Sequence, residues 1–200
     1  MPKIVDHEHR RTELVQAALR IVVRSGLSGA TMRDIAHEAG FANGAIKPYF
    51  QTKADLLLAT YEHIYRATNA RMRARTRGKR GLAALEGFAE EVLPVNPALQ
   101  EEAMVFLAFL GKAAQNPEHL RVSRNSMEEW RTWIRDWLAE AIDDGEVGAG
   151  LDVDIHADLL LTLAIGAQPM SILDRQRFTS ENLRRMVRRH LDRLRGEQDA

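Results

Sequence analysis

The chain has 200 residues, of which 45% are hydrophobic and 28% are charged, the usual balance of a globular protein with one or two domains. It has no cysteine, which excludes disulfides, thiolate metal sites and cysteine nucleophiles. The formal net charge is zero, but residues 1–80 hold 15 Lys and Arg against 7 Asp and Glu, whereas residues 81–200 hold 13 against 21. This asymmetry suggests that only the first part of the chain meets nucleic-acid phosphates.

The N-terminus carries charged residues within its first ten positions and has no apolar signal-peptide region. We also find no apolar run that approaches the roughly 20 residues needed to cross a bilayer. We therefore expect a cytoplasmic protein that does not enter a membrane.

An apolar stripe at helical spacing predicts a first helix over residues 8–25, with Gly26 at its end. The stripe consists of Leu14, Ala17, Ala18, Ile21 and Val22. The arginines near the start of this helix lie mostly off the stripe. They either reach DNA phosphates or form a solvated face, and the sequence leaves both readings open.

The segment 31–53 reads as two short helices joined by a tight turn. Thr31 and Asp34 have the spacing of a capping box, and Gly40 stands where a left-handed C-cap residue is expected. A second short helix is expected over 43–49, and Thr52 with Asp55 forms another capping box at the start of the next helix. This is the pattern of a helix-turn-helix, whose second helix enters a DNA major groove.

The same segment resembles the DNA-binding region of the TetR family of transcriptional regulators. The matching residues are Thr31, Ile35, Ala36, Ala39, Gly40, Gly44, Ile46, Phe50, Lys53 and Leu56. The opening MPKIV and the run G-A-I-x-x-Y-F further resemble the choline-responsive BetI branch. The resemblance implies an all-α, nine-helix protein with a three-helix DNA-binding domain at 1–52 (motif 31–50) and a ligand-binding and dimerisation domain at 53–200.

The resemblance also implies a ligand-responsive repressor that binds a near-palindromic operator on double-stranded DNA as a homodimer. The expected DNA contacts are Thr31, Arg33, Asn43, Gly44, Ala45, Lys47, Tyr49 and Lys53. Lys47 can reach guanine O6 and N7 or a phosphate, and Asn43 can contact DNA, cap the helix or do both. Pro48 lacks an N–H and disfavours helical backbone at Lys47, so we expect this helix to be short or distorted at its end.

The rest of the chain predicts six further helices and no strand. A long helix over 53–75 links the two expected domains, and a short one follows over 82–93. Asn96-Pro97 and Asn116-Pro117 each place an N-cap residue before proline, so a helix should begin at each pair. Asp152 or Asp154, and then Thr179 or Ser180, are expected to cap the last two helices.

The resemblance assigns the last two helices to a dimeric four-helix bundle, although they could instead only complete the core of one subunit. The residues expected at the dimer interface are Leu160, Leu163, Gly166, Ala167, Leu183, Met186, Val187, His190 and Leu191. No metal ligand set or cofactor motif is found, so we expect neither.

Aromatic and methionine side chains between the two ends are the candidates for a small-molecule inducer site, although such residues at helical spacing more often form plain core. They are Tyr61, Phe88, Met104, Phe106, Phe109, Trp130, Trp133 and Trp137. An acidic domain with tryptophan faces would suit a cationic ligand held by cation–π contacts.

Two other functional classes remain as alternatives. An enzyme is disfavoured, because adjacent acidic pairs such as Glu128-Glu129 diverge on a helix and the histidines form no catalytic constellation. An all-α interaction protein that does not bind DNA is the second alternative, because Pro48 departs from the usual motif. We expect no catalytic residues.

Overall fold

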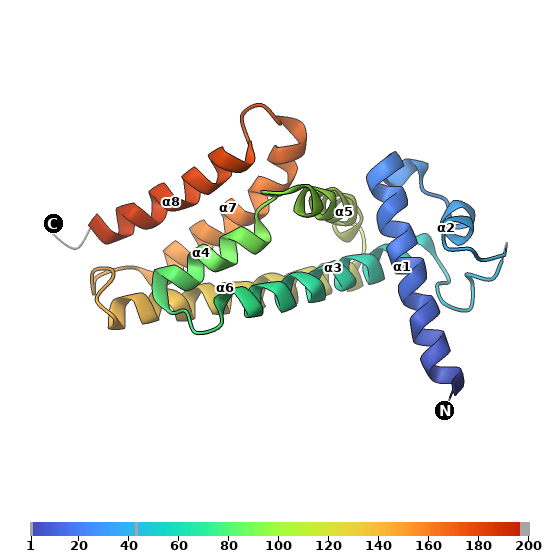
Figure 1. Cartoon of the computed structure of the whole chain (residues 1–200), viewed down its shortest axis with the longest axis horizontal. Helices are drawn as coiled ribbons and strands as arrows, with labels where there is room; N and C mark the ends of the chain where they lie inside the picture. The colour runs from blue at the N-terminus through green and yellow to red at the C-terminus, as the bar shows by residue number, and fades with distance from the viewer. Residues whose placement is uncertain (1, 43, 197–200) are drawn as a thin grey trace. The chain divides into compact units, whose positions relative to one another are not determined.

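The computed structural model describes residues 2–42 and 44–196, and in these ranges the protein has eight α-helices and no strand (Figure 1). The all-α prediction is confirmed, and the expected count of nine helices is wrong by one. The helices are α1 (Pro2–Gly29), α2 (Met32–Glu38), α3 (Lys53–Thr76), α4 (Gly81–Val92), α5 (Pro97–Ala113), α6 (Pro117–Asp143), α7 (Val153–Leu173) and α8 (Ser180–Gly196).

The missing helix is the one expected over 43–49, where residues 44–49 form consecutive turns. Gly44 has a φ of 88°, outside the range of a right-handed helix. Pro48 has no N–H to donate to the carbonyl of Gly44, so the helical hydrogen bond between these positions cannot form. The distortion expected from Pro48 therefore removes the regular helix altogether.

The first helix begins at Pro2 rather than at residue 8, but four later starts that the sequence predicted are confirmed by side-chain hydrogen bonds to backbone N–H groups. Asn96 Oδ1 accepts from Leu99 N at 3.0 Å, and Asn116 Oδ1 accepts from Glu118 N at 2.9 Å. Asp152 and Thr179 cap α7 and α8 in the same way. These caps involve residues two or three positions apart, which is why a local pattern suffices to predict them.

The chain folds into two units, the first made of residues 1–66 and 104–120 and the second of residues 67–103 and 121–200. In the first unit α1 packs on α2, and Gly26 interrupts the helical backbone near the end of α1 with a φ of 67°. Glu38 on α2 accepts hydrogen bonds from Arg20 at 2.9 Å and Arg24 at 3.1 Å on α1. The hydrogen bond from Arg20, and then that from Arg24, lowers the pKa of Glu38. These bonds link α1 to α2 beside their packed faces.

In the second unit α4 and α8 lie side by side (Figure 1). The apolar stripe of α8 is buried within the chain and consists of Leu183, Val187, Leu191 and Leu194. The start of α4 is held by carboxylates from α6 and the loop after it: Glu140 accepts from Gly81 N at 3.2 Å and Glu146 accepts from Leu82 N at 2.7 Å. Gln168 on α7 donates to the carbonyl of Val92 at the other end of α4, at 2.7 Å. Both ends of α4 are thus satisfied by distant side chains.

By length and composition alone, α7 is apolar enough to cross a membrane, which differs from the sequence expectation. Only a third of the stretch is buried, and a helix of a water-soluble protein passes the same test. Its exposed apolar side chains include Ile155, Leu159 and Leu173, which are 51–75% exposed. The composition of α7 therefore reflects a partly uncovered face.

Candidate nucleic-acid interface

The helix α2 is set by side-chain and backbone caps at its two ends. Thr31 Oγ1 accepts from Asp34 N at 3.1 Å, and its hydroxyl donates to the Asp34 carboxylate at 2.6 Å. The hydrogen bond from the Thr31 side chain lowers the pKa of Asp34 and keeps it ionised at the helix N-terminus. At the other end Gly40, with a φ of 75°, donates to His37 O, and Phe41 donates to Ala36 O. This pair of bonds is a Schellman motif, and it turns the chain sharply away from α2.

The turns after α2 are held by short-range bonds and by two buried side chains. Tyr49 N and Phe50 N both donate to Ile46 O, at 2.9 and 3.0 Å. Ile46 and Phe50 are 4% and 2% exposed, so they anchor the turns in the core of the first unit. Gln51 Nε2 donates to Lys47 O at 3.1 Å. The segment is thus a fixed loop, although it is not a regular helix.

A groove of about 390 Å³ separates α2 from these turns, and its lining includes Arg33, Gly44 and Lys47. A second concavity, of about 470 Å³, adjoins Arg33 and is lined also by Thr31, Asp34 and His37. The two adjoining concavities therefore bring together four of the residues expected from the sequence: Thr31 at the N-cap of α2, Arg33 on α2, and Gly44 and Lys47 on the turns. Arg33 and Lys47 are exposed, so their cationic groups can reach phosphates or base edges.

The groove is also lined by residues that the sequence did not indicate as DNA contacts, namely Met32, Ala36, Ile46 and Gln51. Gln51 is the most informative, because its amide can both donate to and accept from a base edge. The sequence offered one indication of Gln51 as a DNA contact, namely that it is a polar residue directly before the capping box at Thr52. Because Gln51 lies outside the expected helix, only the course of the turns places it beside Lys47.

The other expected DNA contacts lie at the edges of this surface or outside the described residues. Asn43 lies outside the described residues, and Ala45 is half-buried. The ring of Tyr49 packs against His7, with ring centres 4.6 Å apart, and edge-on against Phe41. Lys53 is the first residue of α3 and is partly buried; burial, and then the charge of Lys112, lowers its pKa.

The candidate ligand residues fall into two clusters, one in each unit. In the first unit Tyr61 and Phe109 are buried and stack with ring centres 4.0 Å apart, and Phe106 lies 6.3 Å from Tyr61. Met104 is partly buried on the same helix as the two phenylalanines. Much of this aromatic surface is occupied by neighbouring rings, as in an ordinary core.

The second cluster surrounds Phe88 on α4. Trp130 meets Phe88 edge-on with ring centres 5.6 Å apart, and Trp137 lies 6.0 Å from it. Trp130 Nε1 donates to the buried Asn69 Oδ1 at 2.8 Å, which fixes the indole. Trp133 differs, because the guanidinium of Arg73 already covers its ring at 5.4 Å. A protein cation thus occupies one of the faces expected to meet a ligand.

The residues expected at the dimer interface separate by burial. Five of them are covered within the chain: Leu160, Ala167, Leu183, Val187 and Leu191. Leu163, Gly166 and His190 are partly exposed, and Met186 is 43% exposed. Ile155, Leu159 and Leu173 are exposed on α7 and were missed, because periodicity alone does not show which face of an apolar helix is covered.

Two family models match this chain. Residues 14–60 match the model of bacterial regulatory proteins of the tetR family, and residues 82–196 match the model of the BetI-type transcriptional repressor, C-terminal. The second match covers more than half of the chain.

Relatives and solved structures agree with these matches. HTH-type transcriptional regulator PksA of Bacillus subtilis is 27% identical over 197 residues, which cover 97% of this chain and 94% of the relative. BetI of Paraburkholderia phymatum is 32% identical over 122 residues, but the match spans only 58% of this chain and 61% of BetI. A crystal structure from Saccharomonospora viridis in complex with choline has a TM-score of 0.85 and 22% identity, covering 92% of this chain and 96% of that one. PksA and BetI are transcriptional regulators and both family models describe regulators, so the enzyme alternative is rejected.

Proposed function

Because this chain belongs to the TetR family of transcriptional regulators, we propose that it is a homodimeric repressor that binds a near-palindromic operator through residues 31–53 and is released by a small molecule. DNA binding is assigned to residues 1–52, and ligand binding and dimerisation to residues 53–200. A regulator of this kind works where the bacterial chromosome is, in the cytoplasm.

The observation that carries the DNA-binding role is the groove that unites Arg33 and Lys47 across the turns. Arg33 at the start of α2 binds a backbone phosphate, and Lys47 reaches a guanine edge or a second phosphate. Gly44 between them has no side chain, so the DNA backbone can approach closely. The Gln51 amide extends the readout, and Thr31 and Lys53 bind phosphates at helix starts. The loop form of residues 44–49 makes operator choice depend on Lys47 and Gln51.

Fluorescence anisotropy with the protein's own promoter region tests this role. We expect binding that weakens steeply with salt, because each neutralised phosphate releases counterions. Lys47→Ala should change both affinity and base preference, whereas Arg33→Ala should weaken binding to every sequence alike. Arg124→Ala on α6 removes an exposed arginine of the second unit and serves as the matched control. If the protein does not bind this DNA even at low salt, the alternative of an all-α interaction protein would be favoured.

An exposed stripe on α7 supports the homodimer. Ile155, Leu159 and Leu173 share one side of the helix with Gly166, and a Cβ placed on Gly166 would meet no atom within 4 Å. Nothing within the subunit requires glycine there, whereas a close-packed partner helix would. The buried residues of α8 then hold that helix in place, and Met186 adds to the contact. Two such subunits would hold their DNA-binding surfaces about one helical turn, roughly 34 Å, apart on the operator.

The oligomeric state tests the dimer. Leu159→Gln should shift the protein towards monomer in light scattering at micromolar concentration and weaken operator binding. Leu120→Gln on α6 changes a leucine of similar exposure outside the stripe and should remain dimeric. A wild-type protein that is monomeric at all concentrations would contradict the proposal.

The small molecule is proposed to be a quaternary ammonium compound such as choline. Support comes from the choline complex of the Saccharomonospora viridis protein, from the BetI-type C-terminal match and from the three tryptophans. Titration with choline should change tryptophan fluorescence and lower operator affinity together, since a ligand that prefers one conformation shifts the population towards it. Sodium chloride at equal ionic strength is the control. No change in either signal at saturating choline would rule out this ligand.

A further inference from the structure

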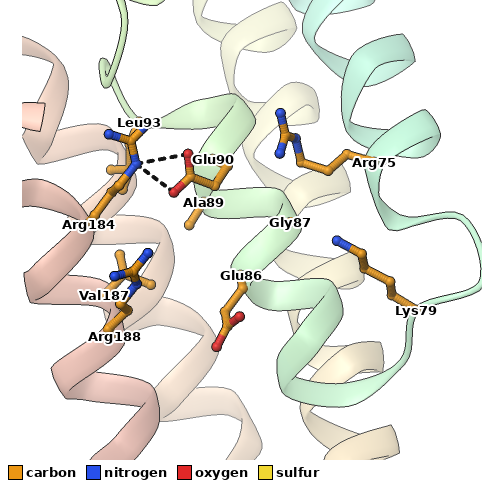
Figure 2. Close-up of a pocket in the computed structure, with 10 residues that line it drawn as sticks. All are labelled: Arg75, Lys79, Glu86, Gly87, Ala89, Glu90, Leu93, Arg184, Val187 and Arg188. Carbon is orange, nitrogen blue, oxygen red and sulfur yellow. Dashed lines mark hydrogen bonds and ion pairs between the residues drawn. The ribbon is translucent and has the colours of Figure 1, made fainter. Parts of the chain in front are cut away.

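A cavity of about 160 Å³ lies in the second unit between the end of α3, the middle of α4 and α8 (Figure 2). Figure 2 shows Arg75 and Lys79 on one side of α4 and Arg184 and Arg188 on the other. The lining is completed by Glu86, Gly87, Ala89, Glu90, Leu93 and Val187. We propose that this cavity is a binding site for a small dianion, such as inorganic phosphate or a short dicarboxylate.

The side chains that line the cavity carry two more positive than negative charges. Arg184 Nε donates to both carboxylate oxygens of Glu90, at 2.7 and 3.0 Å, so these two charges cancel. Arg75 Nε donates to one carboxylate oxygen of Glu91, a residue outside the lining, at 2.5 Å. The remaining carboxylate, Glu86, has an arginine partner from further along α8 at 3.7 Å. The lining thus holds four cationic side chains against two carboxylates, which leaves it with a net charge of +2.

The surplus cations are Lys79 and Arg188, which make no ion pair with any residue that the structure describes. Lys79 is placed by the end of α3, because Gly78 turns the chain with a φ of 71° and Lys79 N donates to Thr76 O at 2.9 Å. Arg188 extends from the adjacent turn of the helix that carries Arg184. Two unmatched positive charges in one concavity favour a ligand with two negative charges.

The size of the cavity restricts the ligand. A cavity of about 150 Å³ holds one benzene molecule, whereas drug-sized ligands occupy roughly 300–1,000 Å³. The 160 Å³ here therefore has room for phosphate or a short dicarboxylate. The guanidinium of Arg188 suits the paired oxygens of either anion, and Lys79 adds a point charge.

The site is separate from the proposed dimer contact. On α8, Arg184 and Arg188 lie on one side of the buried stripe, whereas Met186 and His190 lie on the other. The cavity can thus be occupied while α7 and the Met186 side of α8 meet a partner subunit. A bound dianion would hold the end of α3 against α4 and α8. The same helix, α3, begins at the capping box of Thr52.

Isothermal titration of the full-length protein with inorganic phosphate, and separately with succinate, tests the site at constant ionic strength. We expect saturable binding of at least one anion with one site per subunit. The double variant Lys79→Gln with Arg188→Gln should lose at least about tenfold in affinity, the loss of roughly one charge-assisted hydrogen bond. Arg185→Gln is the matched control, because Arg185 is exposed on the same helix but does not line the cavity.

The two arms identify the ligand class. Binding of phosphate alone assigns the site to phosphate groups, and binding of succinate alone assigns it to dicarboxylates. Absence of saturable binding of either anion overturns the proposal, as does an equal loss of affinity in Arg185→Gln. Circular dichroism of each variant confirms that the helices are intact, and choline and operator binding are measured separately, so failure here leaves the repressor function untouched.

Discussion

Arg71 joins three helices of the second unit through hydrogen-bonded ion pairs. Its guanidinium donates to Glu91 on α4 at 3.1 Å, and to Glu102 on α5 and Thr68 on α3 at 2.9 and 3.2 Å. The side chain of Arg71 is 38% exposed, but those of Glu91 and Glu102 are only 11% and 21% exposed. Burial disfavours the charged guanidinium, yet the bonds and charges of Glu102 and then Glu91 outweigh it and raise the pKa of Arg71. We predict that Arg71→Met destabilises the fold.

The magnitude follows from what remains after the substitution. Breaking a fully buried ion pair costs about 3–5 kcal/mol, and breaking an exposed one costs about 0–1 kcal/mol. Glu91 keeps its bond to Arg75 at 2.5 Å, and Glu102 keeps the Thr68 hydroxyl at 3.2 Å. Since both carboxylates retain a partner and Arg71 is partly exposed, we expect a loss of about 2 kcal/mol in the free energy of unfolding, from two charge-assisted bonds discounted for screening.

Urea unfolding at one fixed protein concentration measures this loss, because dimerisation makes stability depend on concentration. A loss of about 2 kcal/mol corresponds to a fall of roughly 4–8 °C in Tm for a chain of this length. Arg195→Met is the matched control: Arg195 also makes two ion pairs, with Glu86 at 3.7 Å and Asp192 at 3.0 Å, but all three side chains are 44–63% exposed. It should cost less than about 0.5 kcal/mol.

The reasoning depends on burial, and the comparison of the two variants can refute it. If Arg71→Met costs no more than Arg195→Met, the network around Arg71 does not stabilise α3 against α4 and α5. The loss for Arg71→Met should also persist in 1 M salt, because partly buried pairs are screened less than exposed ones. If the stability loss of Arg71→Met disappears in 1 M salt, the ion pairs of Arg71 behave like exposed surface pairs.

Three further predictions concern stability. Gly81→Ala should cost about 2 kcal/mol or more in urea unfolding, because Gly81 has a φ of 51° and an added Cβ meets the carboxylate that caps α4; Gly111→Ala, where a Cβ meets nothing, should be neutral or stabilising. Trp130→Phe should cost about 1–3 kcal/mol and alter near-ultraviolet circular dichroism, since the buried Asn69 oxygen loses its donor; an unchanged Tm would contradict this. The folded-state pKa of Glu38 lies below its ordinary value of 4.5 because of its two arginine partners, so its contribution is present above that value and is lost as pH falls through the folded pKa. Wild type and Glu38→Gln should therefore differ in stability at pH 7 and converge in acid, which a pH series of unfolding curves checks.

Local patterns predicted the helices well where residues a few positions apart decide the outcome. The caps at Asn96, Asn116 and Asp152 are present because an N-cap side chain bonds an N–H two or three residues away. The turn after α2 follows in the same way from Gly40. The prediction for residues 44–49 was wrong for an equally local reason: the helix-turn-helix pattern indicated a helix there, whereas Pro48 and the left-handed Gly44 prevent its hydrogen bonds.

Local sequence patterns could not predict which helix faces are buried or which side chains lie together. Periodicity marks α7 and α8 alike as apolar, but the stripe of α8 is covered within the chain while Leu159 on α7 is exposed. The aromatic candidates likewise divide between two units, and Arg73 covers Trp133. Each outcome depends on which elements pack together, and a one-dimensional pattern contains no information on that partner.

The sequence by itself determined the family, the helical class and the capped starts of the helices from α5 onward, because these depend on residue type at short spacing. Only the tertiary structure decided that Arg33, Lys47 and Gln51 share one groove. It also decided that Lys79 and Arg188, more than a hundred positions apart, line one cavity. The physical reason is that long-range contacts arise from packing of whole helices, which places side chains together without any signal in their neighbours along the chain.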